Sequence, residues 1–304
     1  MAVTVEVSLI SGRAVSVEAT LDTRVDNLKR RAQTALAVGP GRLCNASGVI
    51  LDEAVTVQMA GLQNGDLLTL QIGNIQIKSS QCAFAAIQAD GCVVSWGLDA
   101  YGGDCSAVRE QLRNVQHLQS NTGAFAAILG DGSVDQLENV RCVQSTRYAF
   151  AAIRKDGSVV TWGDKECGGD SSAVQQQLND VQHIQSTDFA FAAVLGNGSV
   201  VSWGDWACSS HSNPVQDQLR GVKQIQSAER AFAAIRWNGS VVSWGDRTGG
   251  GNSAAVQHQL QNVQKVQSTK RALAAILSDG SVVVWGDEAH GGNCSSVQSE
   301  LQGV

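Results

Sequence analysis

The stretch FAFAAVLGNGSVVSWG, residues 189–204, decides the fold of most of this chain. Its first half is small and apolar, its middle is Asn197-Gly198, and its second half is the short run Ser-Val-Val-Ser-Trp-Gly that ends at Gly204. Short apolar and alternating runs favour strands, and Asn-Gly tolerates the positive φ that a tight hairpin turn requires. The stretch therefore predicts a β-hairpin.

The same pattern recurs through the rest of the chain. Its central aromatic or leucine position is held by Phe84, Phe125, Phe150, Phe191, Phe232 and Leu273. Successive positions are 41 residues apart, except that only 25 separate Phe125 from Phe150. A fixed period of this length indicates a repeat architecture. The repeats span residues 75–115, 116–140, 141–181, 182–222, 223–263 and 264–304, and the second is truncated.

A tryptophan ends the hairpin in five of the six repeats. These residues are Trp96, Trp162, Trp203, Trp244 and Trp285. One large ring per repeat is typical of packing between neighbouring repeats. We therefore interpret the five rings as structural and not as five binding sites.

A Gly-Gly or equivalent turn and then a serine-rich segment follow the tryptophan. In the repeat at 141–181, Ser172 and Gln175 fit a capping box, and Val174, Leu178 and Val181 fit one short helix. An outer edge strand fits the same residues, so the sequence leaves both alternatives open.

The first 73 residues follow a different pattern. Two alternating segments predict a hairpin, and apolar residues at helical spacing predict a helix that Thr23 and Asp26 begin with a capping-box-like pair. The expected elements are a hairpin (3–9 and 15–19), a helix (25–36), a short strand at 42–43 and a closing strand (67–72).

This order resembles ubiquitin and its relatives of the β-grasp fold. The local matches are Ser11-Gly12, Asp22-Thr23, Arg42-Leu43, Leu51-Asp52 and 66–70. The resemblance implies an α+β ubiquitin-like domain at residues 1–73. Ubiquitin is conjugated through two terminal glycines, whereas Gly73 here stands alone, so processing is not expected.

The ubiquitin resemblance also implies where a receptor would bind. The apolar patch that receptors grip maps onto Ile10, Cys44 and Gln71, of which one is a large apolar residue. Ile10 is therefore a candidate contact, and ordinary ubiquitin receptors are not expected to recognise the patch as a whole.

The repeats resemble those of the regulator of chromosome condensation (RCC) family. The shared features are a V-x-x-I-x-S strand, an alanine-rich strand, the Asp-Gly-x-Val-x-x-Trp-Gly pattern and a glycine turn, across residues 75–304. The resemblance implies that residues 74–304 form a mainly-β, short-repeat, propeller-like array. The family closes rings of seven blades, so five full repeats and a truncated one predict open strand edges, through which the chain could self-associate.

Composition and motifs narrow the chemistry. The chain has 22 basic and 28 acidic residues, a net charge of −6, without the basic face that nucleic acid requires. No catalytic, cofactor-binding or metal-binding motif is found, no run of residues is apolar enough to span a membrane, and the eight cysteines form no Cys-x-x-Cys pair. The sequence predicts an intracellular, cytoplasmic protein without cofactor, with the nucleus as an alternative.

Two tryptophans break the repeat. Trp206 replaces a loop position that holds Lys165 and Arg247 in other repeats, and Trp237 lies just before a hairpin turn. Packing does not demand either ring, and exposed tryptophans are favoured interface anchors. We interpret both as candidate contacts for a protein partner.

The two resemblances together imply a function. Large ligases of the HERC type pair similar repeats with a catalytic HECT domain, which this chain lacks, so no enzymatic activity is expected. The best interpretation is a non-catalytic scaffold or adaptor linked to ubiquitin signalling, with protein partners. The alternatives are a regulator that promotes nucleotide exchange on a small GTPase, and a propeller that inhibits an enzyme.

Overall fold

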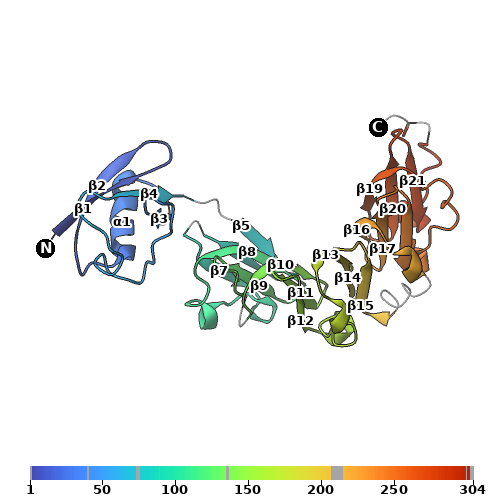
Figure 1. The fold of residues 1–304 in the computed structure, drawn as a ribbon, viewed down its shortest axis with the longest axis horizontal. Coiled ribbons are helices and arrows are strands. Elements are labelled where there is room, and N and C mark those ends of the chain that lie inside the picture. Colours follow the sequence, from blue (N-terminus) through green and yellow to red (C-terminus); the bar gives the residue numbers. More distant parts are fainter. Residues whose placement is uncertain are drawn as a thin grey trace. The chain divides into compact units, whose positions relative to one another are not determined.

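The computed structural model describes residues 2–39, 41–72, 76–88, 90–134, 137–206, 215–298 and 300–301. Contacts divide the chain into two compact units, Met1–Leu118 and Gln119–Val304. Figure 1 shows the elements of both units, coloured along the sequence. The predicted boundary at residue 73 lies within the first unit, and Gly73, Cys208 and His211 lie outside the described residues.

The first unit begins with a four-stranded mixed sheet and one helix. Its strand order is β2-β1-β4-β3, in which β1 and β4 run parallel and the other pairs antiparallel. The elements are β1 (Ala2–Ser8), β2 (Ala14–Thr20), α1 (Val25–Leu36), β3 (Arg42–Cys44) and β4 (Leu67–Gln71). The predicted succession of hairpin, helix, short strand and closing strand is confirmed.

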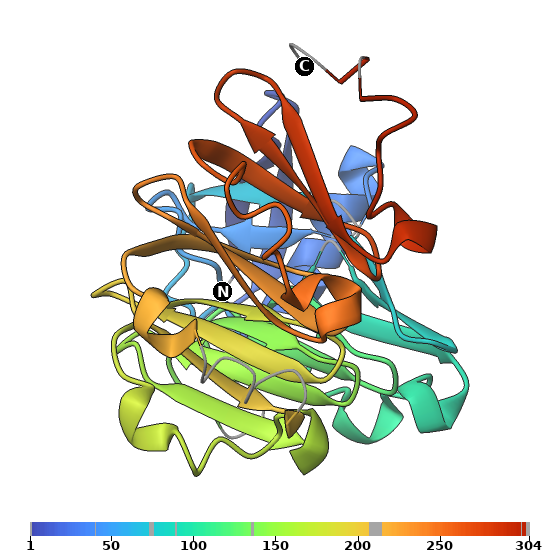
Figure 2. The ribbon, with the colours of Figure 1, turned by 90° about the vertical axis from the view of Figure 1, so that its right-hand side faces the viewer.

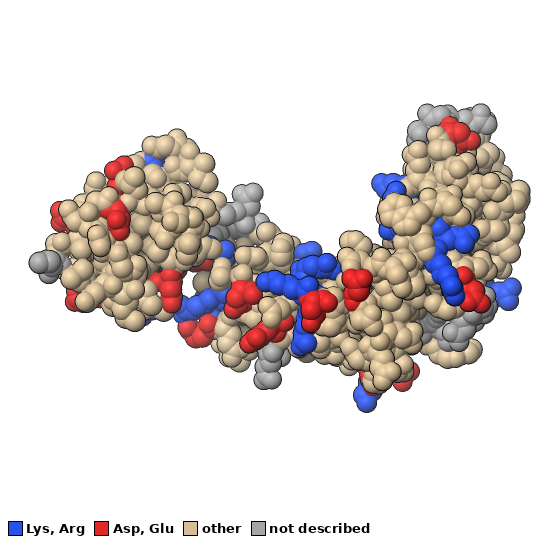
Figure 3. All heavy atoms as spheres, in the orientation of Figure 1, with Lys and Arg blue, Asp and Glu red and all other residues tan. Residues whose placement is uncertain are grey.

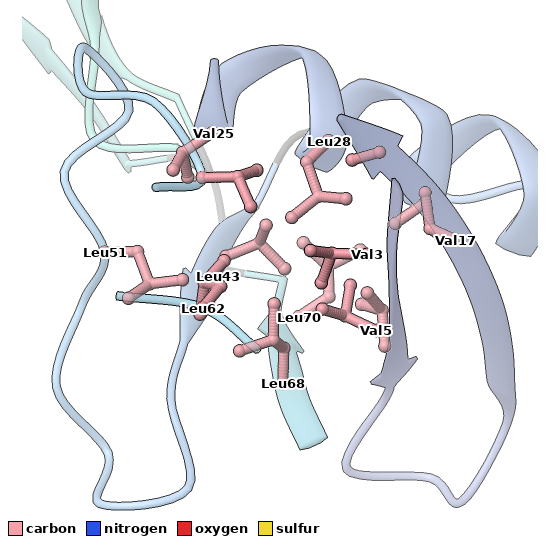
Figure 4. Packing of buried hydrophobic residues seen from close by; sticks show 14 of the residues in the cluster. Val3, Val5, Val17, Val25, Leu28, Leu43, Leu51, Leu62, Leu68 and Leu70 are labelled. Carbon is pink, nitrogen blue, oxygen red and sulfur yellow. The ribbon is translucent and has the colours of Figure 1, made fainter. Parts of the chain in front are cut away.

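One core holds this sheet and α1 together. Figure 4 shows Val3 and Val5 from β1, Leu28 from α1 and Leu68 and Leu70 from β4 pointing toward one another. Alternate residues of a strand share one face, which is why every second residue of β1 and β4 is buried. Each such valine or leucine stabilises the fold by about 1.5–3 kcal/mol.

The predicted start of α1 is wrong in detail. The N-cap is Arg24, which makes no side-chain capping hydrogen bond. The Thr23 hydroxyl instead accepts a hydrogen bond from the N–H of Thr20, at 3.0 Å. Thr23 therefore closes the turn before the helix, because its side chain satisfies a strand-end donor in place of a helical one.

The first unit continues with the first repeat. The strands β5 (Gln76–Ser79), β6 (Ala83–Ile87) and β7 (Val93–Gly97) form a three-stranded antiparallel sheet, followed by the short 3₁₀ turns η1 (Asp99–Tyr101) and η2 (Ser106–Val108). The truncated repeat supplies only β8 (Val115–Ser120), inside which the division between units falls, and β9 (Phe125–Leu129).

The second unit contains four further three-stranded antiparallel sheets, one from each full repeat (Figure 2). Their strands are β10 (Val140–Ser145), β11 (Ala149–Arg154), β12 (Val159–Gly163), β13 (Val181–Ser186), β14 (Ala190–Leu195), β15 (Val200–Gly204), β16 (Val222–Ser227), β17 (Ala231–Arg236), β18 (Val241–Gly245), β19 (Val263–Ser268), β20 (Ala272–Leu277) and β21 (Val282–Gly286). The predicted mainly-β array of short repeats, one of them truncated, is confirmed.

The hairpin turns are confirmed at the level of the backbone. Within residues 189–204, β14 pairs with β15 from Ala190 with Gly204 to Val194 with Val200. Gly198 has a φ of 77°, as the turn requires. The pairing places Phe191 directly opposite Trp203.

The element after each tryptophan is neither of the two predicted. In the described residues of the second unit these segments contain the single turns η3 (Lys165–Cys167), η4 (Gln175–Gln177), η6 (Arg247–Gly251) and η7 (Glu288–His290). The short helix through Val174 and Val181 does not form, because Val181 already begins β13. Ser172 does not act as a cap either, since the N-cap of η4 is Val174 and no side chain caps it.

Candidate interaction surfaces

The middle strand of each sheet divides its side chains between two neighbours. Phe191 and Ala193 belong to the core shared with the preceding sheet, whereas Ala190 and Ala192 belong to the core shared with the following one. Small alanines on the second face leave room for the phenylalanine and tryptophan of the next repeat. The Ala-Phe-Ala-Ala pattern therefore encodes stacking of sheets as well as a strand.

A glycine turn of one repeat covers the aromatic pair of the next. The rings of Phe191 and Trp203 stack at 5.2 Å between centroids. The Trp203 indole N–H donates to the carbonyl oxygen of Gly168, at 3.1 Å, in the turn of the preceding repeat. Gly168 has a φ of +92°, and a Cβ there would lie 2.7 Å from the Phe191 ring. Glycine is thus needed both for the turn and for the close contact.

The same contact recurs between the last two repeats. The Trp285 indole N–H donates to the carbonyl oxygen of Gly250, at 2.9 Å. A Cβ on Gly250 would lie 2.5 Å from Leu273. Trp244, which stacks on Phe232, is equally buried, and the segment of the preceding repeat that corresponds to the Gly168 turn lies outside the described residues.

The aromatic pair is open where no complete repeat comes before it. Phe84 and Trp96 stack at 5.4 Å, yet they are 45% and 46% exposed, whereas Trp203 is 4% exposed. Trp162 stacks on Phe150 and is only partly buried, and the truncated repeat before it lacks a glycine turn. Burial of the tryptophan therefore follows the presence of a turn from the preceding repeat.

A row of hydrogen-bonded serines joins the first strands of successive repeats. The hydroxyl of Ser186 donates to the carbonyl oxygen of Ser145 at 2.7 Å, that of Ser227 to Ser186 at 2.6 Å, and that of Ser268 to Ser227 at 2.6 Å. Because each bond joins equivalent residues, the sheets stack with the same ends aligned.

A second row runs through the loops that follow these strands. The backbone N–H of Arg147 donates to Asp188, that of Asp188 to Glu229, and that of Glu229 to Lys270, at 2.8–3.0 Å. The row places two acidic side chains next to each other between two basic ones. On the face that Figure 3 presents, acidic and basic side chains are likewise intermixed.

The acidic pair raises the pKa of one carboxyl. Burial, and then the charge of Glu229, raise the pKa of Asp188 above its ordinary value of 3.8, and Arg147, Lys270 and Arg230 oppose this shift only in part. A raised carboxyl pKa means that the folded state binds the proton more tightly than the unfolded state. The resulting stability is present below pH 3.8 and is lost as pH rises through the raised pKa.

Asp188→Asn is therefore expected to stabilise the protein at pH 7 by about 0.5 kcal/mol, the scale of one like-charge contact across neighbouring strands. The gain should shrink as the pH falls through the raised pKa toward 3.8. Urea unfolding of both proteins between pH 8 and pH 4 measures the effect. Glu166→Gln, at an exposed carboxylate outside this row, is the control. A pH-independent difference would show that charge is not its cause.

Trp206 and Trp237 are exposed but do not share a surface. Their exposed fractions are 74% and 72%. Trp206 follows the Gly204 end of β15, whereas Trp237 follows the opposite end of β17. The backbone N–H of Trp237 donates to the carbonyl oxygen of Gly221. Because the sheets stack with equal ends aligned, the two indoles lie at opposite ends of neighbouring sheets. The Trp237 ring also faces the Lys223 ammonium, 5.6 Å from its centroid.

The ubiquitin-type patch is reduced to one apolar residue. Ile10 is exposed at the tip of the turn between β1 and β2, and Gln71 is exposed at the end of β4. Cys44 is buried, and its burial raises the pKa of its thiol. Cys44 thus offers no surface for a receptor, and Ile10 remains as the candidate.

The described residues also bear on metal and thiol chemistry. Among them, no group of three or more histidine, cysteine, aspartate or glutamate side chains is placed to hold a metal ion. All seven cysteines in the described parts of the chain are free thiols.

No helix in the described ranges is long and apolar enough to cross a membrane.

Sequence reasoning missed the exposed Phe84 and Trp96 pair. The five repeat tryptophans share one motif, so the motif alone makes them equivalent. The available signal was their order along the chain, since only Trp96 and Trp162 follow something other than a complete repeat.

Comparison with known proteins identifies no family. No family model matches the chain, and no curated protein does. Solved structures similar to it include the ectodomain of the receptor kinase CR4 from Physcomitrella patens, with 14% identity, a TM-score of 0.43 and coverage of 71% of this chain and 63% of that one. Yeast RCC1 (Prp20) bound to Kap60 matches with 14% identity, a TM-score of 0.42 and 70% coverage of each chain.

A further solved structure matches a smaller part of the chain. A designed protein based on ubiquitin has 19% identity and a TM-score of 0.22, over 23% of this chain and 87% of that one. The chain spans less than two thirds of the CR4 ectodomain. Similarities this weak define neither a family nor an activity for this chain.

Proposed function

We propose that this chain is a non-catalytic, cytoplasmic protein-binding scaffold. In this proposal residues 1–73 form a ubiquitin-like domain and residues 74–304 an RCC-type, propeller-like array. The order β2-β1-β4-β3 with α1 packed on one face supports the first assignment, and the succession of hairpin sheets with glycine turns supports the second.

The exposed indoles of Trp206 and Trp237 carry the proposal. Each replaces a residue that packing does not require, and each is about three-quarters exposed. The backbone N–H of Trp237 donates to the carbonyl oxygen of Gly221 in the preceding repeat, so binding at Trp237 would order little backbone. Large, rigid aromatic side chains on an ordered surface are the residues that anchor protein interfaces. Their position at opposite ends of the sheets supports two separate contacts, on one partner that spans the sheets or on two partners.

The ubiquitin-like domain supplies the link to a pathway. An adaptor needs one surface that binds a client protein and another that binds a component of the ubiquitin pathway. In this proposal the array binds the client and residues 1–73 bind the pathway component. Ile10, on an exposed turn, is the residue proposed to contact that component.

Replacing Trp206 and Trp237 together with alanine is expected to weaken capture of partners by the full chain tenfold or more, while leaving its unfolding midpoint unchanged. The loss of exposed rings removes contact area for the partner and little from the core. Quantitative mass spectrometry of proteins retained from a lysate by wild type and variant measures the effect.

The matched control carries Arg247→Ala and Ser278→Ala. Each residue holds the position of Trp206 or Trp237 in the repeat that follows, 41 residues along the chain. Identical partner profiles for wild type and the double tryptophan variant would contradict the proposed sites. Retention of a single GTPase, with faster nucleotide release from it, would favour the exchange regulator over the adaptor.

A further inference from the structure

The exposed aromatic pair of the first repeat is an unoccupied copy of an interface that the chain uses internally. In the repeats that contain Trp203 and Trp285 the equivalent rings lie beneath a glycine turn, whose carbonyl oxygen accepts a hydrogen bond from the indole. Phe84 and Trp96 keep the stacked geometry of those pairs, at 5.4 Å, but are nearly half exposed. The residues before this repeat form the sheet of β1 to β4, which carries no turn of this kind.

The last repeat presents the complementary half. Its turn keeps the shape of the others, since Gly291 has a φ of +96° and the Thr269 hydroxyl donates to the carbonyl oxygen of His290 at 2.8 Å, as Thr146 does to Cys167 at 2.9 Å. A Cβ on Gly291 would meet only Thr269, at 3.9 Å. The turn is therefore formed but covers no aromatic pair.

The sheet face beside this turn is open as well. Ala192 and Ala233 are fully buried by the repeat that follows each of them, whereas Ala274 and Ile276, on the corresponding face of β20, are only partly buried. This face is apolar and lined by small residues, as are the faces that receive a following repeat.

The serine row and the backbone row described above both end in groups that could bond to a further repeat. At one end lie the hydroxyl of Ser79 and the carbonyl of Gln81, at the positions of Ser186 and Asp188. At the other end lie the carbonyl of Ser268 and the N–H of Lys270. Among the described residues, none of these four groups bonds to another repeat.

We propose that two copies of this chain associate head to tail, with the Gly291 turn of one copy covering Phe84 and Trp96 of the other. The Trp96 indole N–H donates to the Gly291 carbonyl oxygen, as Trp285 does to Gly250. The occupant is a second copy because the chain itself carries the turn, the small-residue face and the two rows that fit. This contact lies on sheet faces, is separate from the proposed partner sites, and joins unlike surfaces, so it can extend beyond two copies.

Sedimentation velocity of the full chain over a concentration series tests the proposal. Wild type is expected to form concentration-dependent oligomers. Trp96→Ala removes the receiving ring, and Gly291→Ala places a methyl group where the contact at Gly168 leaves 2.7 Å to a ring. Each variant is expected to raise the dissociation constant tenfold or more. Circular dichroism checks that both remain folded.

Mixing the two variants gives the sharpest outcome. The Trp96→Ala copy keeps an intact turn and the Gly291→Ala copy keeps an intact aromatic pair, so an equimolar mixture should form dimers that grow no further. Met59→Ala and Gly12→Ala, which change an exposed apolar side chain and a positive-φ glycine elsewhere, should associate as wild type does.

Two results would overturn the proposal. One is a wild type that stays monomeric at every concentration. This result contradicts the proposal both when a fluorescence quencher reaches Trp96 and when Trp96 is shielded within one chain. The other is association that persists unchanged in both single variants.

Discussion

Trp203→Ala is expected to lower the free energy of unfolding of the second unit by about 3–5 kcal/mol, the cost of removing a fully buried aromatic ring. The ring is 4% exposed, stacks on Phe191 and bonds to Gly168. Its loss opens a cavity between two sheets and leaves the glycine carbonyl without this donor. Urea unfolding followed by circular dichroism measures the change.

Trp96→Ala is the matched comparison, because it alters the same motif position where the ring is 46% exposed. It should cost about 1–2 kcal/mol, since about half of the ring is already in water. Equal costs at the two positions would contradict the account, because they would show that the preceding turn contributes nothing to burial of the tryptophan.

Gly168→Ala is expected to cost about 3 kcal/mol, the sum of a left-handed backbone penalty and overpacking against a ring. Gly168 has a φ of +92°, and its new methyl group would lie 2.7 Å from the Phe191 ring. Thermal or urea unfolding of the variant gives the value.

Gly291→Ala separates the two causes. Gly291 has a φ of +96° and only Thr269 near its Cβ position, so alanine there should cost about 1–2 kcal/mol from the backbone alone. The additional loss of unfolding free energy in Gly168→Ala, compared with Gly291→Ala, measures the contact between repeats. If both variants lost the same stability in dilute monomer, that contact would be absent.

Local structure was predictable from the sequence because its signals are local. Asn197-Gly198 and the short apolar runs on either side of it determine a hairpin within 16 residues, and the 41-residue period then extends it to every full repeat. The helix α1 was likewise placed by its apolar spacing. Its start was not, since Thr20 and Thr23 lie close enough for a competing hydrogen bond that spacing does not reveal.

Relations between repeats could not be predicted in the same way. The motif makes Trp96 and Trp203 identical, and only the three-dimensional contact of a preceding turn makes one exposed and the other buried. Trp206 and Trp237 could be singled out because they break the repeat, but their position at opposite ends depends on how the sheets align. That either binds a partner stays a prediction.

The turns around Gly168 and Gly250 shield the tryptophan of the next repeat. Hydrogen exchange of the seven tryptophan indole N–H groups, resolved by NMR at a concentration where the chain is monomeric, tests this shielding most directly. We expect slow exchange for the buried Trp203, Trp244 and Trp285 and fast exchange for the half-exposed Trp96 in the same sample. Protection of Trp96 equal to that of Trp203, or fast exchange at all five repeat positions, would contradict it.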